Sequence, residues 1–564
     1  MLQVRNQISS SDLSTTDSRI INDLLDNKLI TTEEITILLE EYHKRGSDIG
    51  TSLIDFGFIS EIDFNEFIQQ QYGCAVVNLK TAPIDSDAIS LISKEVAARY
   101  TFLPFAKNKN TICVATKDIL DNNVQNTMLS YIRTNENIVL HYARKMDITD
   151  AIEVVYTEDI KIQDKITELG LTELGNETGN QTVQFVNFML KDALKRDASD
   201  IHIEPEESFI RIRYRIDGVL IKISVFHKKY WPNILNRIKI ISGMNITEAR
   251  HPQDGRLEAT ILGREVDFRL ASQPTIHGEN VIIRILDKKK SLTTLENLGI
   301  SKGNNAKLKQ ALDRPDGIII VTGPTGSGKT TTLYSALAYL NNIEVNIMTL
   351  EDPVEYSIPL IRQTAIQDDI GLTFNAGIRS LMRQDPDIML IGEVRDLATA
   401  QAAIRASLTG HKVLTTLHTI DAISAIQRLT DIGIDRYMLS GNIVAIVAQR
   451  LVRKLCNHCK KPRVATDEDF AQLKLKKPDK AITIYDHAGC SKCSNTGYRG
   501  RTAVSEVLLI DSAIDDMITG NQTRNAILSV AKKNGFKTLA DDAKMRIMQG
   551  VTDLHEVQRI VSVR

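Results

Sequence analysis

Eight consecutive residues have the composition and spacing of a loop that binds phosphate groups. They fit the pattern G-x-x-x-x-G-K-[ST] at every fixed position: Gly323, Pro324, Thr325, Gly326, Ser327, Gly328, Lys329 and Thr330. Glycines allow successive backbone N–H groups to face phosphate oxygens, and a following helix adds positive potential at its N-terminus. Lys329 can then reach the β and γ phosphates, and Thr330 can bind Mg²⁺. The stretch predicts a nucleotide site, which we extend to Thr331.

The segments on either side of this loop favour phosphate binding over a chance glycine-rich turn. Residues 317–321 form an apolar run rich in β-branched side chains, and residues 331–340 have the pattern of a helix. A strand, the loop and a helix are therefore expected in the order that the motif requires.

Two later apolar runs end in acidic residues. Residues 347–350 lead into 351–355, which contain three carboxylates, and residues 388–391 lead into Gly392 and Glu393. P-loop ATPases keep acids at such strand ends for Mg²⁺ and water. Because Gly392 replaces the usual aspartate, we assign Glu393 to Mg²⁺ and Glu355 to the attacking water. A charged turn without chemistry is the alternative.

A third apolar strand is expected within residues 409–419, with His411 before it and His418 at its end. Either histidine alone is most simply a structural residue. At the end of a strand that follows a phosphate loop and two acidic strand ends, His418 resembles a sensor of the γ-phosphate.

Four of the six cysteines form two C-x-x-C pairs, Cys456 with Cys459 and Cys490 with Cys493, separated by 30 residues. Paired thiolates suit a tetrahedral Zn²⁺ ion that is structural, since no open ligand position is implied. The separation exceeds that of compact zinc ribbons, so we expect a small insertion between the pairs. His458 and His487 are alternative ligands.

Arginines occur singly within several apolar strand patterns. Residues 210–216 alternate apolar side chains with Arg211, Arg213 and Arg215, and a turn and a return strand follow at 219–223. Arg269 and Arg284 each interrupt a further apolar strand. Arginine in such surroundings requires an anionic partner. For Arg211, Arg213 and Arg215 two interpretations stay open: a strand face exposed to solvent, or a row of charges that faces phosphate.

The N-terminal region contains a weak repeat at an offset of 29 residues, in which each copy has the pattern of two short helices. Thr31 and Ser60 lie at N-cap positions with acids three residues later. We expect a helical bundle over residues 1–73 and a linker over 157–181. Between them, short apolar runs at 75–77 and 111–115 alternate with helical patterns and predict a small α/β subdomain over 74–156. A helix near residues 183–196 follows.

Composition limits the class of protein. The 564 residues suggest three or four domains, and the formal net charge of −2 lacks the basic excess of a nucleic-acid binder such as a helicase. No stretch approaches 18 consecutive apolar residues, and the polar N-terminus lacks the core of a signal peptide. We therefore expect a cytoplasmic protein.

Together these motifs resemble the secretion ATPase superfamily of type II secretion systems and type IV pilus assembly. The resemblance covers about residues 181–564, and the motifs occur in family order: the phosphate loop, the Asp box at 351–355, the Walker B region at 385–396 and the His box at 410–419. The cysteine pairs and the following residues 496–501 are similar to those of the assembly or export branch.

This resemblance implies an α/β protein with a RecA-like ATPase domain at 289–564, including a zinc subdomain at 450–505. A PAS-like α+β domain at 182–288 precedes it. Arg256, Arg269 and Arg284 match positions from which the family supplies charge to phosphate, which implies a ring of subunits, a hexamer in this family. The expected cofactors are ATP, Mg²⁺ and Zn²⁺.

The N-terminal repeat resembles a family domain that binds cyclic di-GMP in some members through paired R-L-G-x-x-L segments. Residues 19–24 lack the glycine, and Asp48 stands where an arginine would meet phosphate. The dinucleotide is therefore disfavoured. We expect instead docking to an inner-membrane platform protein and to the cytoplasmic domain of a membrane assembly protein, with pilin or pseudopilin acted on indirectly and no nucleic acid bound.

The resulting hypothesis is a cytoplasmic ATPase, recruited to the inner membrane, that powers type II secretion or type IV pilus assembly. A nucleotide-gated scaffold and a DNA-transport ATPase of a type IV secretion-like system are the alternatives. The sequence leaves open which of the two assembly systems the chain serves.

Overall fold

The computed structural model describes residues 13–45, 48–79, 82, 84–108, 111–132, 137–156, 179–262, 264–287, 293–474 and 481–561. The chain divides into two compact units, one of Met1–Ile216 and Leu220–Asp287, the other of Asp217–Val219 and Lys288–Arg564. Most of the expected linker, residues 157–178, lies outside the described residues. Among the helices described, none is long and apolar enough to cross a membrane.

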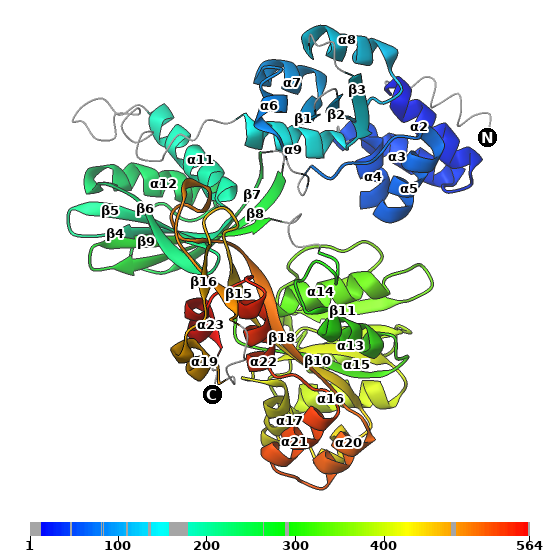
Figure 1. The fold of residues 1–564 in the computed structure, drawn as a ribbon, viewed down its shortest axis with the longest axis vertical. Helices are drawn as coiled ribbons and strands as arrows, with labels where there is room; N and C mark the ends of the chain where they lie inside the picture. Colours follow the sequence, from blue (N-terminus) through cyan, green and yellow to red (C-terminus); the bar gives the residue numbers. More distant parts are fainter. Residues whose placement is uncertain are drawn as a thin grey trace. The chain divides into compact units, whose positions relative to one another are not determined.

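The N-terminal repeat forms two pairs of helices, as predicted (Figure 1). They are α2 (Thr15–Asp26), α3 (Thr32–Arg45), α4 (Ile49–Asp55) and α5 (Glu61–Tyr72). Thr31 accepts the Glu34 N–H at 3.2 Å and Ser60 accepts the Asp63 N–H at 3.1 Å, so both predicted N-caps are confirmed. Lys28 and Gly57 occupy equivalent left-handed positions, with φ of 58° and 72°.

A three-stranded sheet follows, built from β1 (Phe102–Asn108), β2 (Thr111–Thr116) and β3 (Asn137–Tyr142). Its helices are α6 (Ser86–Ile89), α7 (Lys94–Tyr100), α8 (Asn122–Ile132) and α9 (Lys145–Val155). Ile119 and Tyr142 from this part pack into the core of the preceding helices. The apolar run at 75–77 makes only an isolated bridge at Val76.

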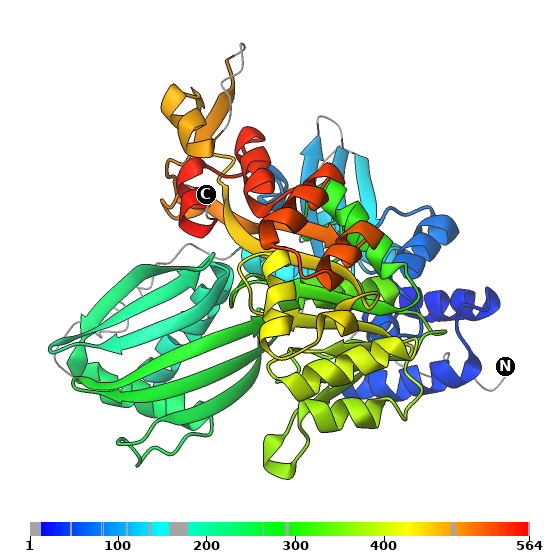
Figure 2. The same cartoon turned by 90° about the horizontal axis from the view of Figure 1, so that it is seen from below.

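The remainder of the first unit is a six-stranded antiparallel sheet in the order β6-β5-β4-β9-β8-β7, whose strands lie side by side in Figure 2. Its strands are β4 (Ala198–Pro205), β5 (Phe209–Ile216), β6 (Val219–His227), β7 (Gln253–Ile261), β8 (Arg264–Thr275) and β9 (Gly278–Asp287). Strand alternation turns residues such as Ile201, Ile212 and Phe268 toward α11 (Gly179–Lys195) and α12 (Trp231–Ile241), which share one core with them. The arginines therefore lie on the opposite face, and the predicted hairpin of β5 and β6 is confirmed.

The second unit is built on a seven-stranded sheet in the order β12-β11-β13-β14-β10-β15-β18. Its strands are β10 (Gly317–Thr322), β11 (Ile347–Glu351), β12 (Arg362–Ala365), β13 (Ile388–Ile391), β14 (Lys412–Leu417), β15 (Ile443–Leu455) and β18 (Tyr498–Leu509). Neighbours are parallel except β15 with β18. The four strands predicted around the motifs, β10, β11, β13 and β14, are thus confirmed.

Both faces of this sheet are buried. Ile318 and Ile320 of β10 pack into one core, while Ile319 and Val321 pack into another on the opposite face. Parallel strands covered on both faces are apolar throughout. The covering helices include α13 (Lys302–Leu312), α14 (Lys329–Leu340), α15 (Phe374–Leu381), α16 (Leu397–Leu408) and α17 (Ala422–Asp431).

Between β15 and β18 the chain leaves the main sheet and returns. Between the two cysteine pairs, this segment contains β16 (Lys461–Val464), α19 (Asp467–Leu473) and β17 (Thr483–Asp486). The short helix α18 (Arg436–Leu439) precedes β15. After β18 come α20 (Ser512–Thr519), α21 (Arg524–Lys533), α22 (Leu539–Met548) and α23 (Leu554–Ile560).

Candidate nucleotide site and cysteine cluster

The phosphate-type loop connects the end of β10 at Thr322 to the start of α14 at Lys329. Gly323, Gly326 and Gly328 have φ of 154°, 77° and 88°, which side chains other than glycine rarely adopt. The Lys329 ammonium donates to the carbonyls of Gly323 at 3.0 Å and Pro324 at 3.3 Å. The Lys329 pKa is lowered, because the effect of burial exceeds the opposing effect of the Glu393 carboxylate.

Three neighbouring parallel strands, β13, β14 and β10, end at this same edge of the sheet. The Thr322 hydroxyl donates to the Leu417 carbonyl at 3.0 Å, and the Thr419 N–H donates to that hydroxyl at 2.9 Å. The strand end that carries the phosphate loop is thereby fixed to the segment that contains His418.

Glu393 and His418 meet at this edge. His418 Nε2 lies 3.8 Å from a carboxylate oxygen of Glu393, and Arg395 forms an ion pair with the other oxygen. Burial lowers the His418 pKa first, and the positive charge of Lys329 lowers it further. A neutral imidazole thus lies beside a carboxylate and an ammonium, and the structure brings together Lys329, Glu393 and His418.

The two glutamates at and after the end of β11, Glu351 and Glu355, lie in different surroundings. Glu351 is buried, where it accepts hydrogen bonds from the hydroxyl of Thr349 at 2.6 Å, the amide of Gln363 at 3.2 Å and the hydroxyl of Tyr334. Glu355 is half-buried four residues later, and its N–H donates to Tyr334 at 3.3 Å. Because Tyr334 is on α14, the helix that begins at Lys329 also fixes the backbone of Glu355.

Sequence reasoning did not single out Arg395, Gln449 or Arg450 at this site. Arg395 lies two residues after Glu393, within the acidic segment already noted. Gln449 lies beside the loop on β15 and Arg450 next to it donates to the Ile420 carbonyl at 2.7 Å. The amide of Gln449 and the guanidinium of Arg450, which directly follow the apolar run 443–448, are the signal that could have revealed them.

Arg256, Arg269 and Arg284 lie in the first unit, away from the motifs along the chain. Arg256 is paired across the ladder with Arg269, which is paired with Arg284, so the three stand side by side on β7, β8 and β9. Arg256 donates to Asp267 at 2.9 Å and Arg284 to Asp200 at 3.2 Å. Their side chains remain 62% and 65% exposed.

The arginines of β5 have carboxylate partners on β4 and in the turn that joins β4 to β5. Arg211 pairs with Glu206 at 3.0 Å, Arg213 with Glu204, and Arg215 with Asp200 at 3.4 Å. The internal anions account for these three charges without a bound phosphate.

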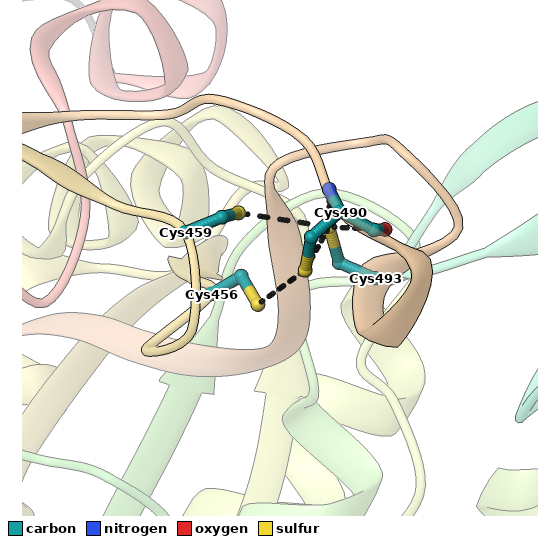
Figure 3. Close-up of side chains that lie close together, drawn as sticks. All are labelled: Cys456, Cys459, Cys490 and Cys493. Atoms are coloured by element: carbon teal, nitrogen blue, oxygen red, sulfur yellow. Dashed lines mark hydrogen bonds between the residues drawn. The ribbon is translucent and has the colours of Figure 1, made fainter.

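The four cysteines of the C-x-x-C pairs converge in the second unit (Figure 3). Sγ–Sγ distances are 3.9 Å for Cys456–Cys490, 3.8 Å for Cys459–Cys493 and 3.7 Å for Cys490–Cys493. A tetrahedron with Zn–S bonds of about 2.3 Å has S–S edges of about 3.8 Å. The thiols therefore fit a Zn²⁺ ion in size as well as in chemistry.

Backbone donors around Cys493 favour its thiolate. The N–H groups of Cys490 and Gly497 each donate to its Sγ at 3.3 Å. Burial raises the Cys493 pKa, but these donors and the neighbouring thiols outweigh it and lower the pKa to about 7. His487, an alternative ligand, has Nδ1 at 2.6 Å from Asp553, while His458 is exposed. The four cysteines are the better ligand set.

Asp48, the acid expected to repel cyclic di-GMP, caps helix α4. It is buried and accepts both the N–H and the hydroxyl of Thr51 at 2.9 Å. The aspartate that replaces an arginine at this position therefore serves as the N-cap of α4.

Comparison with known proteins gives two family matches. Residues 176–559 match the family described as "Type II/IV secretion system protein", and residues 72–161 match the MshEN domain.

Two relatives and one solved structure extend these matches. The chain is 38% identical over 550 residues to the "Type IV pilus assembly ATPase PilB" of Myxococcus xanthus, covering 95% of this chain and 97% of that protein. It is 43% identical over 387 residues to the "Type II secretion system ATPase E" of Vibrio cholerae, covering 69% and 76%. The X-ray structure of the Legionella pneumophila ATPase DotB covers 69% of this chain and 96% of that one, with a TM-score of 0.51 at 21% identity, which shows a shared fold.

Proposed function

Because the chain belongs to the type II/IV secretion system protein family, we propose that it is the ATPase that powers assembly of a pilus or pseudopilus. ATP hydrolysis is the activity named for its relatives in both systems. Of the two systems, type IV pilus assembly is favoured, since the match to the Myxococcus relative extends along nearly the whole of both chains.

The meeting of Lys329, Glu393 and His418 at one sheet edge is the observation that carries this proposal. Residues 323–331 hold the phosphates of ATP. Thr330 and Glu393 supply oxygen ligands, which Mg²⁺ prefers. Mg²⁺ neutralises phosphate charge when bound, while His418, held neutral by its surroundings, responds to the γ-phosphate. Catalysis of this kind is mainly positioning and charge stabilisation.

Glu355 orients or deprotonates the attacking water. Its backbone is fixed to α14 through Tyr334, so it is tied to the helix that carries Lys329. Arg256, Arg269 and Arg284 neutralise charge that develops on phosphate. In this proposal the arginines complete the site of a neighbouring subunit in a hexameric ring.

Further parts of the proposal concern the rest of the chain. The domains are 1–73, 74–156, a linker at 157–181, a PAS-like domain at 182–288 and a RecA-like domain at 289–564. Zn²⁺ on the four cysteines stabilises a subdomain at 450–505. The N-terminal domains dock to an inner-membrane platform protein and a membrane assembly protein, without cyclic di-GMP or nucleic acid, and thereby recruit a cytoplasmic ATPase to that membrane.

Steady-state phosphate release by the purified chain with Mg²⁺ and ATP tests the proposal. The wild type is expected to turn over, whereas Glu355→Gln should retain nucleotide binding and lose at least about a hundredfold in rate, because only the water-activating group is removed. Nucleotide binding by a wild type that does not hydrolyse ATP would favour a gated scaffold. Substantial hydrolysis by Glu355→Gln would remove Glu355 from its role.

Salt-sensitive binding of DNA would instead favour the DNA-transport alternative. The two assembly systems are distinguished by the genes beside this one, which should encode a major pilin if the chain serves a type IV pilus.

A further inference from the structure

Gln449 lies directly beside the phosphate-binding loop. Strand β15 runs parallel to β10, with Ala448 paired to Thr322, the last residue before the loop. The next residue along β15, Gln449, is therefore level with the loop, and its side chain is buried at 1% exposure. A buried amide destabilises a fold unless its polar atoms find partners.

Both ends of the Gln449 amide have partners at the nucleotide site. Its Nε2 donates to the Ser327 carbonyl at 2.8 Å, and its Oε1 accepts from the Thr332 hydroxyl at 2.8 Å. Ser327 is within the loop and Thr332 is in the first turn of α14. One side chain thus fixes the loop and the helix that follows it.

The bond to Ser327 determines where the next N–H group points. In a trans peptide the carbonyl and the following N–H point in opposite directions. Because the Ser327 carbonyl points out of the loop toward Gln449, the Gly328 N–H points to the opposite side, into the loop. That is where a phosphate oxygen accepts in a loop of this type.

We propose that Gln449 is a positioning residue of the nucleotide site, which holds the Ser327–Gly328 peptide with its N–H aimed at a phosphate of ATP or ADP. The inference rests on the proposed function, since it assigns the loop to nucleotide phosphates. It adds a residue on another strand, about 120 positions along the chain, to the set that determines nucleotide affinity.

The glycines of the loop support this role independently. A Cβ added to Gly323 would lie 2.6 Å from the backbone oxygen of Gln449, and one added to Gly328 would lie 3.1 Å from its Nε2. Gln449 thus packs against the loop at both positions: a side chain at Gly323 would overlap its backbone oxygen, and one at Gly328 would press on its amide nitrogen.

Arg450, the next residue on β15, links Gln449 to the segment that follows His418. It donates to the Gln449 carbonyl at 2.9 Å and to the Ile420 carbonyl, two residues after His418, at 2.7 Å. The residue that orients the loop and the segment that carries His418 are therefore joined through one guanidinium.

Gln449→Leu removes both hydrogen bonds at similar volume. We expect the Kd for MgADP, measured by calorimetry on the full chain, to rise about ten- to a hundredfold, because a hydrogen bond to a charged phosphate is misaligned. The KM for ATP should rise in parallel with a smaller change in kcat, since the contact is made before and during the reaction.

Asn442→Leu is the matched control. Asn442 is a buried amide just before the other end of β15, where it donates to the Met438 carbonyl at 2.9 Å. Its loss should lower the thermal midpoint and leave the Kd for MgADP unchanged. If Gln449→Leu behaves in the same way, the residue is only structural and the inference is wrong.

Gln449→Glu gives a second measurement if the leucine variant folds poorly. An ionised carboxylate repels the Ser327 carbonyl, but the protonated acid can donate to it, and burial raises the pKa of such an acid. The deficit in MgADP affinity relative to wild type should therefore shrink as the pH falls from about 8 to about 6. A deficit that is absent, or constant with pH, contradicts the inference, whereas failure of the wild type to bind MgADP contradicts the proposed function itself.

Discussion

At the scale of single residues, the second unit contains one carboxyl group whose protonation should affect stability near neutral pH. Glu506 on β18 is buried, and its two oxygens accept the N–H groups of Ala422 and Leu539, each at 2.7 Å. These bonds favour the ionised form, but burial outweighs them and raises the Glu506 pKa from 4.5 to about 7. The side chain joins the N-termini of α17 and α22 to the sheet.

Between about pH 4.5 and 7 the folded chain therefore keeps a proton on Glu506 that the unfolded chain releases. The resulting stabilisation is complete below pH 4.5 and is lost as the pH rises to 7, by up to about 3 kcal/mol. We expect the free energy of unfolding of the wild type, measured in urea, to fall relative to that of Glu506→Gln over this window and to run parallel above it. Parallel curves throughout would contradict the raised pKa.

The sequence identified the residues whose chemistry is tied to a motif and missed those whose role depends on strand neighbours. Lys329, Glu393 and His418 follow apolar strands in a recognisable order, and parallel strand ends meet at one edge. Gln449 has no motif, because its importance arises from the placement of β15 next to β10. Strand order cannot be read from local periodicity.

At the scale of elements, the cysteine cluster joins the distal ends of β15 and β18. Cys456 directly follows Leu455, the last residue of β15, and Cys493 precedes Tyr498, the first of β18. These ends are thus connected by the thiols and by the Cys456 N–H bond to the Gly497 carbonyl at 2.9 Å. A metal ion bound here would hold together a segment whose described elements are chiefly a two-stranded sheet and the helix α19.

Cys493→Ser should therefore release the metal and loosen this segment. We expect elemental analysis to find about one zinc per wild-type chain and markedly less in the variant, with faster proteolysis between residues 456 and 498, because a structural site loses a ligand. Cys74→Ser, in the first unit, is the control and should keep both zinc and protease resistance. Equal zinc content in wild type and Cys493→Ser would contradict the assignment.

Periodicity predicted most elements near the site and failed where pairing is marginal. The strands at 317–321, 347–350 and 388–391 are bounded by glycine, proline or charge, and the structure has them at nearly the same residues. The run at 75–77 is as apolar, but it pairs only through Val76. Composition gives the tendency to extend, whereas a sheet also needs a neighbour.

At the scale of the whole molecule, the proposed ring gives a role to the row formed by Arg256, Arg269 and Arg284. Three guanidinium groups in adjacent register repel one another, and Asp267 and Asp200 form ion pairs with Arg256 and Arg284. Arginines in such a row would be stabilised by phosphate. The family resemblance indicated these three arginines as a set, and the sheet register shows that they form one row.

A mixing experiment tests whether the row acts on a neighbouring subunit. Lys329→Ala lacks the lysine that contacts the phosphates, and Arg269→Ala lacks the central charge of the row. Each variant alone should therefore hydrolyse ATP at a few per cent of the wild-type rate or less. In mixed rings, the intact loop of an Arg269→Ala subunit can meet the intact row of a Lys329→Ala subunit. If one subunit supplies the row to the next, phosphate release by a pre-incubated equimolar mixture should rise several-fold above the mean of the separate variants. If each chain uses its own row, every site in the mixture is defective and no gain is possible, so the absence of recovery in rings shown to contain both variants would exclude a shared site.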